Sequence, residues 1–317
     1  MPGRGRRVKS VITPAQAPML PQYSHRAPIA LSVSAHNRIG GRRTDDAWMA
    51  ETWASPRTRV LLLHRGQLVV GLDGASPVWV RPAEAPVGQR VLLGEYGDEV
   101  RFAVLADDVP HGLSVEPLRT HVQTLDPEEA ALVLHAVALA EWHGSHRHCP
   151  RCGGVLEIAD AGHVQVCTDC GRQQFPRTDP AVIMLVTDAE DRCLLGRQAL
   201  WPEGRFSTLA GFVEPGESLE QAVAREVEEE VGVMIEAVDY FGNQPWPFPA
   251  SLMVGFFARA ATTQIDVDGA EISAARWFTR EQMRAEAEVG TLVLPAGISI
   301  SRSLVETWYG GSLPGTW

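Results

Sequence analysis

The segment from residue 211 to residue 233, with the sequence GFVEPGESLEQAVAREVEEEVGV, limits the fold and the chemistry of this chain more than any other. Its second half has no proline or glycine before Gly232, so it predicts a helix that ends there. Glu226, Glu229 and Glu230 are spaced i, i+3 and i+4 and therefore share one helix face. Three neighbouring carboxylates repel one another unless divalent cations lie between them. Hard oxygen ligands of this kind suit Mg²⁺ or Mn²⁺, ions that also bind phosphate oxygens.

A solvated acidic face is the usual explanation of a Glu-rich helix, and residues 228–230 alone would be interpreted that way. The loop before the helix favours a functional site instead. Gly211 lets the backbone approach a neighbour closely, and Glu217 lies within reach of Arg225, so loop and helix brace each other. Pro215-Gly216 adds a turn between them.

The segment follows the spacing G-x5-E-x7-R-E-U-x-E-E-x-G-U, where U is aliphatic. The matching residues are Gly211, Glu217, Arg225, Glu226, Val227, Glu229, Glu230, Gly232 and Val233. The segment is identified as a Nudix box. This resemblance implies metal-dependent hydrolysis of a diphosphate joined to another group, and it leaves that group open.

Length and charge restrict the number of domains and the kinds of partner that the chain can have. A chain of 317 residues predicts two domains with a small module between them. The net charge of −11 argues against DNA or an anionic membrane as a partner. No run of 18 apolar residues predicts a transmembrane helix, and no apolar core follows the basic N-terminus as in a secretory signal. Residues 1–27 are interpreted as a disordered tail or an over-extended start site, with a nucleic-acid-gripping tail as the alternative.

Four of the five cysteines form the pattern C-x2-C-x14-C-x2-C, at Cys149, Cys152, Cys167 and Cys170. Two CxxC pairs, each followed by glycine, predict the tetrahedral Zn²⁺ site of a zinc ribbon. Four thiolates fill the zinc shell, so the site is structural. His146, His148 and His163 are near enough to be considered as ligands, but we interpret them as surface histidines. The odd fifth thiol, Cys193, is expected to be buried, and this cysteine usage indicates a reducing cytoplasm.

After the N-terminal tail, the predicted elements group into four regions along the chain. Residues 28–125 alternate short β-like runs with turns, including a hairpin at Arg65-Gly66, and are interpreted as a structural or dimerising β-rich domain without a second Nudix box. Residues 126–144 predict a linking helix with Asp126 as its N-cap and Glu129 completing a capping box. The zinc ribbon spans 145–178. Residues 179–317 predict a mixed sheet with helices packed on it, an α/β/α sandwich, so the fold class is α+β. No internal repeat of fixed period is visible.

A second motif follows the box. Residues 243–253 read NQPWPFPASLM, in which prolines around two aromatic residues predict a stiff, extended loop with its rings exposed. The simpler interpretation is a loop folded over its own core. With Gln244 to Ser251, however, the chain resembles the NADH pyrophosphatases, whose motif is S-Q-P-W-P-F-P-x-S; only the first serine is replaced, by Asn243. The ribbon and the segment Phe175–Pro180 belong to the same branch, and the resemblance covers residues 126–317.

This resemblance implies a homodimeric, cytoplasmic enzyme that hydrolyses NADH to reduced nicotinamide mononucleotide and AMP, cleaves NAD⁺, and removes NAD caps from RNA 5′ ends. The motif residues Gln244, Trp246 and Phe248 are assigned to substrate binding. Phe175 and Phe212 are expected to stack on substrate rings. Ser251, Met253 and Ser301 are expected to line the nicotinamide end.

The same resemblance assigns the catalytic residues. Glu226, Glu229 and Glu230, together with Glu271, are expected to hold the catalytic Mg²⁺ or Mn²⁺, with Arg225 beside them. Divalent ions lower the pKa of bound water and stabilise charge on phosphoryl oxygens. Glu230 is the candidate general base that accepts the water proton, although the carboxylate that does so varies within the family.

Two alternatives remain open from the sequence. In the first, NAD-capped RNA is the main substrate, and a basic groove beside the active site binds the RNA. The candidate groove residues are Arg172, Arg177, Arg197 and Arg205, each of which also suits an ordinary surface position. In the second, the chain is a non-catalytic nucleotide sensor, but sensors can lose box glutamates and here all of them are present.

Overall fold

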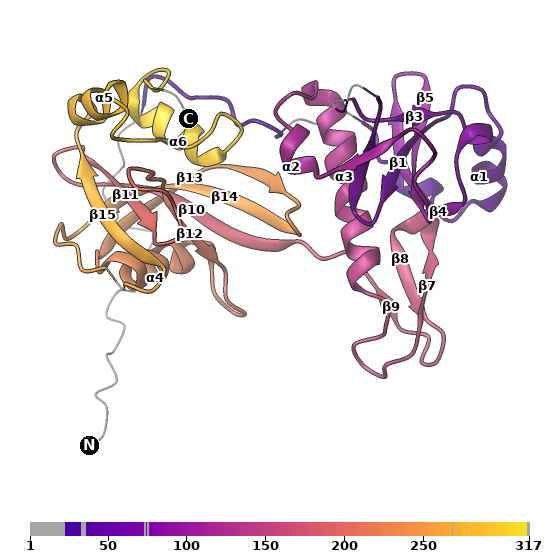
Figure 1. Ribbon diagram of the computed structural model, residues 1–317. Helices are drawn as coiled ribbons and strands as arrows, with labels where there is room; N and C mark the ends of the chain where they lie inside the picture. Colours follow the sequence, from indigo (N-terminus) through magenta and orange to yellow (C-terminus); the bar gives the residue numbers. More distant parts are fainter. Residues whose placement is uncertain (1–22, 33–35, 73, 75, 268, 316–317) are drawn as a thin grey trace. The chain divides into compact units, whose positions relative to one another are not determined.

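The computed structural model describes residues 23–32, 36–72, 74, 76–267 and 269–315 (Figure 1). The chain divides into two compact units. Unit 1 comprises the described residues up to Ile29, Pro180–Gln244 and the chain from Met253 onward, and unit 2 comprises Ala30–Asp179 and Pro245–Leu252. Most of the expected N-terminal tail, residues 1–22, lies outside the described residues, whereas Tyr23–Ile29 are described and belong to unit 1. None of the described helices is both long and apolar enough to cross a membrane.

Unit 1 is built on a six-stranded sheet with the order β13-β14-β10-β11-β15, in which β12 pairs with β10. The strands are β10 (Asp179–Thr187), β11 (Cys193–Gln198), β12 (Leu209–Phe212), β13 (Ile235–Trp246), β14 (Ser251–Ala260) and β15 (Ile272–Phe278). Helix α4 (Leu219–Val231) lies on one side of this sheet, and α5 (Arg280–Glu288) and α6 (Ile300–Tyr309) lie on the other (Figure 1). This arrangement confirms the predicted α/β/α sandwich.

Local sequence explains where these elements begin and end. Strand β10 is buried from Ala181 to Thr187, as expected for a central strand with both faces covered. Helix α4 starts with a capping box between Ser218 and Gln221 and ends at Gly232, whose φ of 71° favours glycine. The capping box satisfies backbone N–H groups that the first helical turn cannot pair internally. The helix that carries the three glutamates is therefore set by local signals at both ends.

Unit 2 contains a second six-stranded sheet with the order β4-β5-β1-β2-β6, in which β3 pairs with β1. Its strands are β1 (Arg59–His64), β2 (Gln67–Val70), β3 (Trp79–Val80), β4 (Gly88–Tyr96), β5 (Glu99–Ala106) and β6 (Ser114–Glu116). Strands β1 and β5 are parallel, and the other pairs with a described register are antiparallel. The predicted β1–β2 hairpin is confirmed, with φ of 50° at Arg65 and 76° at Gly66.

The helices of unit 2 are α1 (Asp46–Trp53), α2 (Leu118–His121) and α3 (Pro127–Ser145), together with the 3₁₀ turns η1 (Gly40–Arg42), η2 (Pro82–Glu84) and η3 (Asp160–Gly162). Helix α3 packs on β1 and β4. Asp126 is its N-cap, as predicted, and accepts a hydrogen bond from the Glu128 N–H. The capping-box role predicted for Glu129 is wrong, because its carboxylate accepts from the Trp79 indole N–H at 2.8 Å.

The two sheets share one strand order, which no fixed-period repeat in the sequence reveals. In each unit the first strand pairs with the second, the third and the fifth, and the fourth strand forms the edge beyond the fifth. Two helices follow the sixth strand in each unit. The difference lies between the third and fourth strands: unit 1 has α4 there, whereas the described chain of unit 2 has only the short turn η2. Unit 2 therefore repeats the topology of unit 1 without its glutamate-bearing helix.

Close backbone packing in unit 2 generates a stability prediction. Gly94 has φ of +138°, and an added Cβ would lie 2.2 Å from the Asn37 carbonyl oxygen. Gly97, in the same hairpin, also has positive φ but has no atom within 4 Å of that position. We expect Gly94→Ala to destabilise the protein by about 2–4 kcal/mol and Gly97→Ala by about 1 kcal/mol. Thermal unfolding of both variants tests this, and equal shifts of Tm would contradict the steric explanation.

Candidate active site and zinc centre

The guanidinium of Arg225 is the centre of the candidate active site in unit 1. Its Nε and Nη2 donate to the two carboxylate oxygens of Glu217 at 2.8 and 2.9 Å, which confirms the predicted brace between loop and helix. Nη1 donates to Glu226 at 2.8 Å and to Glu229 at 3.1 Å. Nη2 also donates to the Phe212 carbonyl oxygen at 2.9 Å. One side chain therefore ties α4 to both the preceding loop and strand β12.

The charges in this cluster shift the pKa values of its side chains. The bonds to Arg225 hold the pKa of Glu217 below its usual value, and the carboxylates around Arg225 raise the pKa of its guanidinium. Burial raises the pKa of Glu226, whereas Arg225 lowers it, and the negative charges of Glu229 and Glu271 raise it further. Glu271, from the segment before β15, therefore lies within electrostatic reach of the box glutamates.

Gly211 leaves the space that the Glu226 carboxylate occupies. A Cβ at residue 211 would lie 1.9 Å from Cδ of Glu226, so no other residue fits there without moving the carboxylate. Gly211 lies on β12 and pairs with Val182 of β10, so its position is fixed by the sheet. The close approach that the sequence predicts for this glycine is confirmed, and its neighbour is the first glutamate of the helix face.

The remaining box glutamates differ in exposure. Glu230 is 5% exposed, whereas Glu229 is exposed on the surface of α4. Glu271 is exposed as well. Arg225 lies between Glu226 and Glu229 and bonds to both. Within the described ranges, the four ribbon cysteines are the only group of three or more His, Cys, Asp or Glu residues whose potential metal-ligand atoms all lie within 4.8 Å of one another. Glu226 and Glu229 bond to the same guanidinium nitrogen and so lie on one side of α4, as their i, i+3 spacing predicts.

Two aromatic residues expected at the substrate have exposed rings. Phe175, in unit 2, is 61% exposed, and Phe212, at the end of β12 in unit 1, is 60% exposed. Both rings are therefore accessible to a ligand, although a single exposed apolar side chain does not by itself mark a binding site. The Phe212 carbonyl oxygen accepts from Arg225, so its backbone lies beside the glutamate cluster.

Gln244 and Ser301 are buried within unit 1, each 1% exposed. The Gln244 amide donates to the Ile298 carbonyl oxygen at 2.7 Å and accepts from the Ile300 N–H at 3.0 Å, so it holds the start of α6 against β13. The Ser301 hydroxyl bonds to those of Ser207 and Thr208 at 2.8 and 2.7 Å. Those two residues precede β12, and no motif in the sequence marks them, because only the fold brings them to α6.

The motif from Gln244 to Met253 is a connection between two long strands, not a free loop. Its first residues complete β13, its last begin β14, and only residues 247–250 form the turn. The expectation of an extended loop with exposed rings is therefore wrong for this segment. Trp246 and Phe248 are half-buried and pack edge to face with ring centroids 5.1 Å apart. Ser251 and Met253, expected at the nicotinamide end, are half-buried in β14.

The zinc centre lies in unit 2, on a three-stranded sheet of β7 (Leu156–Ala159), β8 (Val164–Cys167) and β9 (Gln173–Gln174). The Sγ atoms of Cys149 and Cys170 are 3.8 Å apart, and those of Cys152 and Cys167 are 3.4 Å apart. Tetrahedral zinc with Zn–S bonds of about 2.3 Å places its sulfurs roughly 3.8 Å apart, so the cluster fits the ion. Four cysteine ligands complete its shell, which makes the site structural.

The two cysteine pairs are built alike. The Gly153 N–H donates to the Cys149 carbonyl oxygen at 2.9 Å, and the Gly171 N–H donates to the Cys167 carbonyl oxygen at 3.0 Å. Both glycines have positive φ, 79° and 67°, which explains the glycine after each CxxC. Backbone N–H groups also lower the pKa of Cys149 to about 7, which favours the thiolate that binds metal.

His163 is not a surface histidine, contrary to the sequence prediction. It is 7% exposed, and its Nε2 lies 2.7 Å from the Leu92 carbonyl oxygen of β4. Burial lowers its pKa to about 4, so the neutral imidazole donates this bond. His146 is half-buried and His148 is exposed. His163 thus fastens the ribbon to the sheet of unit 2 instead of binding the metal.

Comparison with known proteins identifies three consecutive segments of the chain. Residues 57–142 match the NADH pyrophosphatase-like rudimentary NUDIX domain, 145–175 match the NADH pyrophosphatase zinc ribbon domain, and 177–293 match the NUDIX domain. The rudimentary match agrees with the repeated topology of unit 2.

Several curated relatives are similar over most or part of the chain. A Mycobacterium bovis protein named NAD-capped RNA hydrolase NudC is 44% identical over 299 residues, which cover 88% of this chain and 94% of the relative. Its Mycobacterium tuberculosis counterpart is 43% identical over the same length. The human NAD-capped RNA hydrolase NUDT12 is 43% identical over 196 residues, 58% of this chain and 42% of that protein.

The zinc centre generates a prediction that uses the fifth cysteine as control. We expect Cys152→Ser to lose most of the bound zinc and to make the ribbon sensitive to proteolysis, because three thiolates leave the shell incomplete. Cys193 is fully buried in β11, away from this site in sequence, so Cys193→Ala should keep the zinc. Metal analysis of both purified variants tests the assignment. Equal zinc content in the wild type and Cys152→Ser would contradict it.

Proposed function

The chain belongs to the Nudix hydrolases, in the family of the NAD-capped RNA hydrolases, and on this premise we propose that it cleaves the diphosphate of NAD(H). The products from NADH are reduced nicotinamide mononucleotide and AMP, and the same reaction removes NAD caps from RNA 5′ ends. The observation that carries the proposal is the Arg225-centred cluster of box glutamates, in a chain 44% identical to an NAD-capped RNA hydrolase over 88% of its length.

The donor set supports Mg²⁺ or Mn²⁺ as the catalytic metal. Carboxylate oxygens are the ligands that these ions prefer, and α4 presents them from one helix face. Gly211 leaves space for the Glu226 carboxylate, and a metal site needs its ligand oxygens to be held in place in this way. Glu226, Glu229 and Glu230 would hold the metal, with Glu271 as a further ligand. When bound, the metal supplies charge neutralisation at the diphosphate and a more acidic water.

Arg225 and Glu230 have separate roles in the proposed reaction. Arg225 keeps the Glu226 and Glu229 carboxylates on one side of α4 and holds the helix to its loop through Glu217. A carboxylate oxygen of Glu230 accepts the proton of the attacking water. Glu230 is 5% exposed and belongs to the same helix as the other box glutamates.

Substrate rings are proposed to stack on Phe175 and Phe212, whose exposed faces suit adenine and nicotinamide. Trp246, Phe248, Ser251 and Met253 complete the binding residues. Gln244 and Ser301 are included as residues that act through α6 and the segment before β12, because their polar atoms bond there. We further propose a homodimer in a reducing compartment such as the cytoplasm, which suits five cysteines without a disulfide.

An assay series over NADH, NAD⁺, ADP-ribose and NAD-capped RNA tests the function. We expect AMP and reduced nicotinamide mononucleotide from NADH in the presence of Mg²⁺ or Mn²⁺. Glu229→Gln should lower kcat/KM by about a hundredfold or more, because it removes a metal-binding charge. Glu228→Gln is the matched control, since this neighbouring glutamate points off the shared face. An intact NADH pool over a range of divalent ions would contradict the proposal, and the ratio of NADH to capped-RNA turnover identifies the preferred substrate.

The role of Gly211 gives a second prediction. We expect Gly211→Ala to lower kcat/KM by about tenfold or more while α4 stays folded, because the added Cβ displaces the Glu226 carboxylate. Gly311→Ala is the control, because a Cβ there has no atom within 4 Å and its φ is not positive. Activity and circular dichroism are measured together. Full activity in Gly211→Ala would show that Glu226 does not need this position.

A further inference from the structure

The short segment from Arg26 to Ile29, here called the strap, packs on unit 1 although the chain of unit 2 separates it from the rest of that unit. The Ala27 N–H donates to Thr307 Oγ1 at 3.0 Å, and the Ser303 hydroxyl donates to the Pro28 carbonyl oxygen at 2.7 Å. Both partners lie on α6, one turn apart. Ala27 is 2% exposed and Thr307 is 3% exposed, so these bonds are shielded from water.

The strap also contacts strand β13. The Arg26 guanidinium lies over the Phe241 ring, 5.0 Å from its centroid, and donates to the Phe241 carbonyl oxygen. The side chain of Ile29 fills the space beside Gly242, where a Cβ would lie 2.3 Å from its Cδ1. Just before the strap, the Tyr23 ring packs on Phe257 of β14 with centroids 4.8 Å apart. The strap therefore joins α6 to β13 from outside both elements.

These two elements carry the buried polar residues that the proposed function assigns to the substrate end. Gln244 lies two residues after Gly242 and spans the start of α6 through Ile298 and Ile300. Ser301, on the first turn of α6, bonds to Ser207 and Thr208, which lead directly into β12 with Gly211 and Phe212. A shift of α6 against β13 would thus disturb the Gln244 hydrogen bonds to α6. It would also move Ser207 and Thr208, the two residues that lead into β12.

We propose that the strap is a positioning element for catalysis: residues Arg26–Ile29 clamp α6 to β13 and thereby set the Gln244 and Ser301 contacts on which substrate binding depends. The inference rests on the proposed function for its effect on substrate. The strap makes no described contact with α4, which carries the box glutamates. Its loss should therefore weaken binding of the dinucleotide more than it slows the chemical step.

The test compares two substitutions at one position. Thr307→Val keeps the shape but removes the acceptor for the Ala27 N–H, and Thr307→Ser keeps the hydroxyl. We expect Thr307→Val to raise KM for NADH about fivefold with kcat within about twofold, and Thr307→Ser to restore the wild-type KM. Arg26→Ala and Ser303→Ala test the same clamp from other contacts, so the result does not depend on the folding of one variant.

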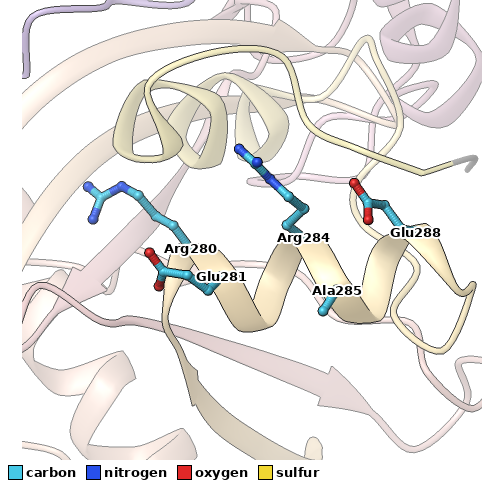
Figure 2. A pocket seen from close by; sticks show the side chains of 5 residues that line it. All are labelled: Arg280, Glu281, Arg284, Ala285 and Glu288. Carbon is cyan, nitrogen blue, oxygen red and sulfur yellow. The ribbon is translucent and has the colours of Figure 1, made fainter.

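A control variant separates positioning from general loosening of α6. Arg280, on α5, donates through Nε and Nη2 to the Trp308 carbonyl oxygen of α6 at 3.0 and 2.6 Å. Figure 2 shows it among the residues that line a pocket along α5, with Arg284 on the same helix. Arg280→Gln should lower Tm and leave KM unchanged, because it releases α6 at a contact that the strap does not share. An equal rise of KM in Arg280→Gln would overturn the inference, as would an unchanged KM in the strap variants.

Hydrogen exchange distinguishes failure of the inference from failure of the proposed function. Strap variants should speed amide exchange in residues 205–210 and 298–302 relative to the wild type and Arg280→Gln, whether or not NADH is the substrate. If the wild type leaves NADH intact, the proposed function fails and exchange alone decides the inference. Unchanged exchange in all strap variants would show that the strap does not position α6.

Discussion

The bidentate pair between Arg225 and Glu217 is the interaction on which the candidate active site depends. Because Arg225 also bonds to Glu226, Glu229 and the Phe212 carbonyl oxygen, the same guanidinium sets helix, loop and strand relative to one another. Its side chain is 22% exposed and that of Glu217 is 13% exposed, so the pair is screened less than a surface ion pair. A planar guanidinium also fixes direction, which a lysine at this position would not do.

Topology explains why one chain contains two similar sheets and a single candidate active site. Both sheets use the same strand order, but the position between the third and fourth strands holds α4 in unit 1 and the turn η2 in unit 2. Without α4, unit 2 lacks the helix face that presents carboxylates. Its cross-strand core, including Val60, Leu92 and Phe102, is fully buried, so the sheet keeps its packing while the chemistry is confined to unit 1.

Within unit 2, buried imidazoles join the zinc ribbon to β4 and α3, in addition to the chain connection. His163 bonds to the Leu92 carbonyl oxygen, and His143 of α3 lies 2.8 Å from the Gly162 carbonyl oxygen and 2.9 Å from the Gln165 amide. Burial lowers the pKa of both histidines, so they are neutral and can make these bonds without the cost of a buried charge. The four cysteines form the zinc site of the ribbon, and these histidine contacts fasten the ribbon to α3 and β4.

The sequence by itself determined the features that rest on local spacing. The helix of the box, its shared glutamate face, the Arg225–Glu217 brace and the four zinc ligands all follow from residues close together in the chain, where helical periodicity and CxxC geometry leave few alternatives. Tertiary structure alone decided the contacts between distant segments: His163 with β4, Ser301 with Ser207 and Thr208, and the strap with α6. Such contacts have no periodic signal in one sequence. A short segment such as Arg26–Ile29 acquires its partners only when the folded sheet and helix offer a surface for it, nearly 280 residues further along the chain at Thr307.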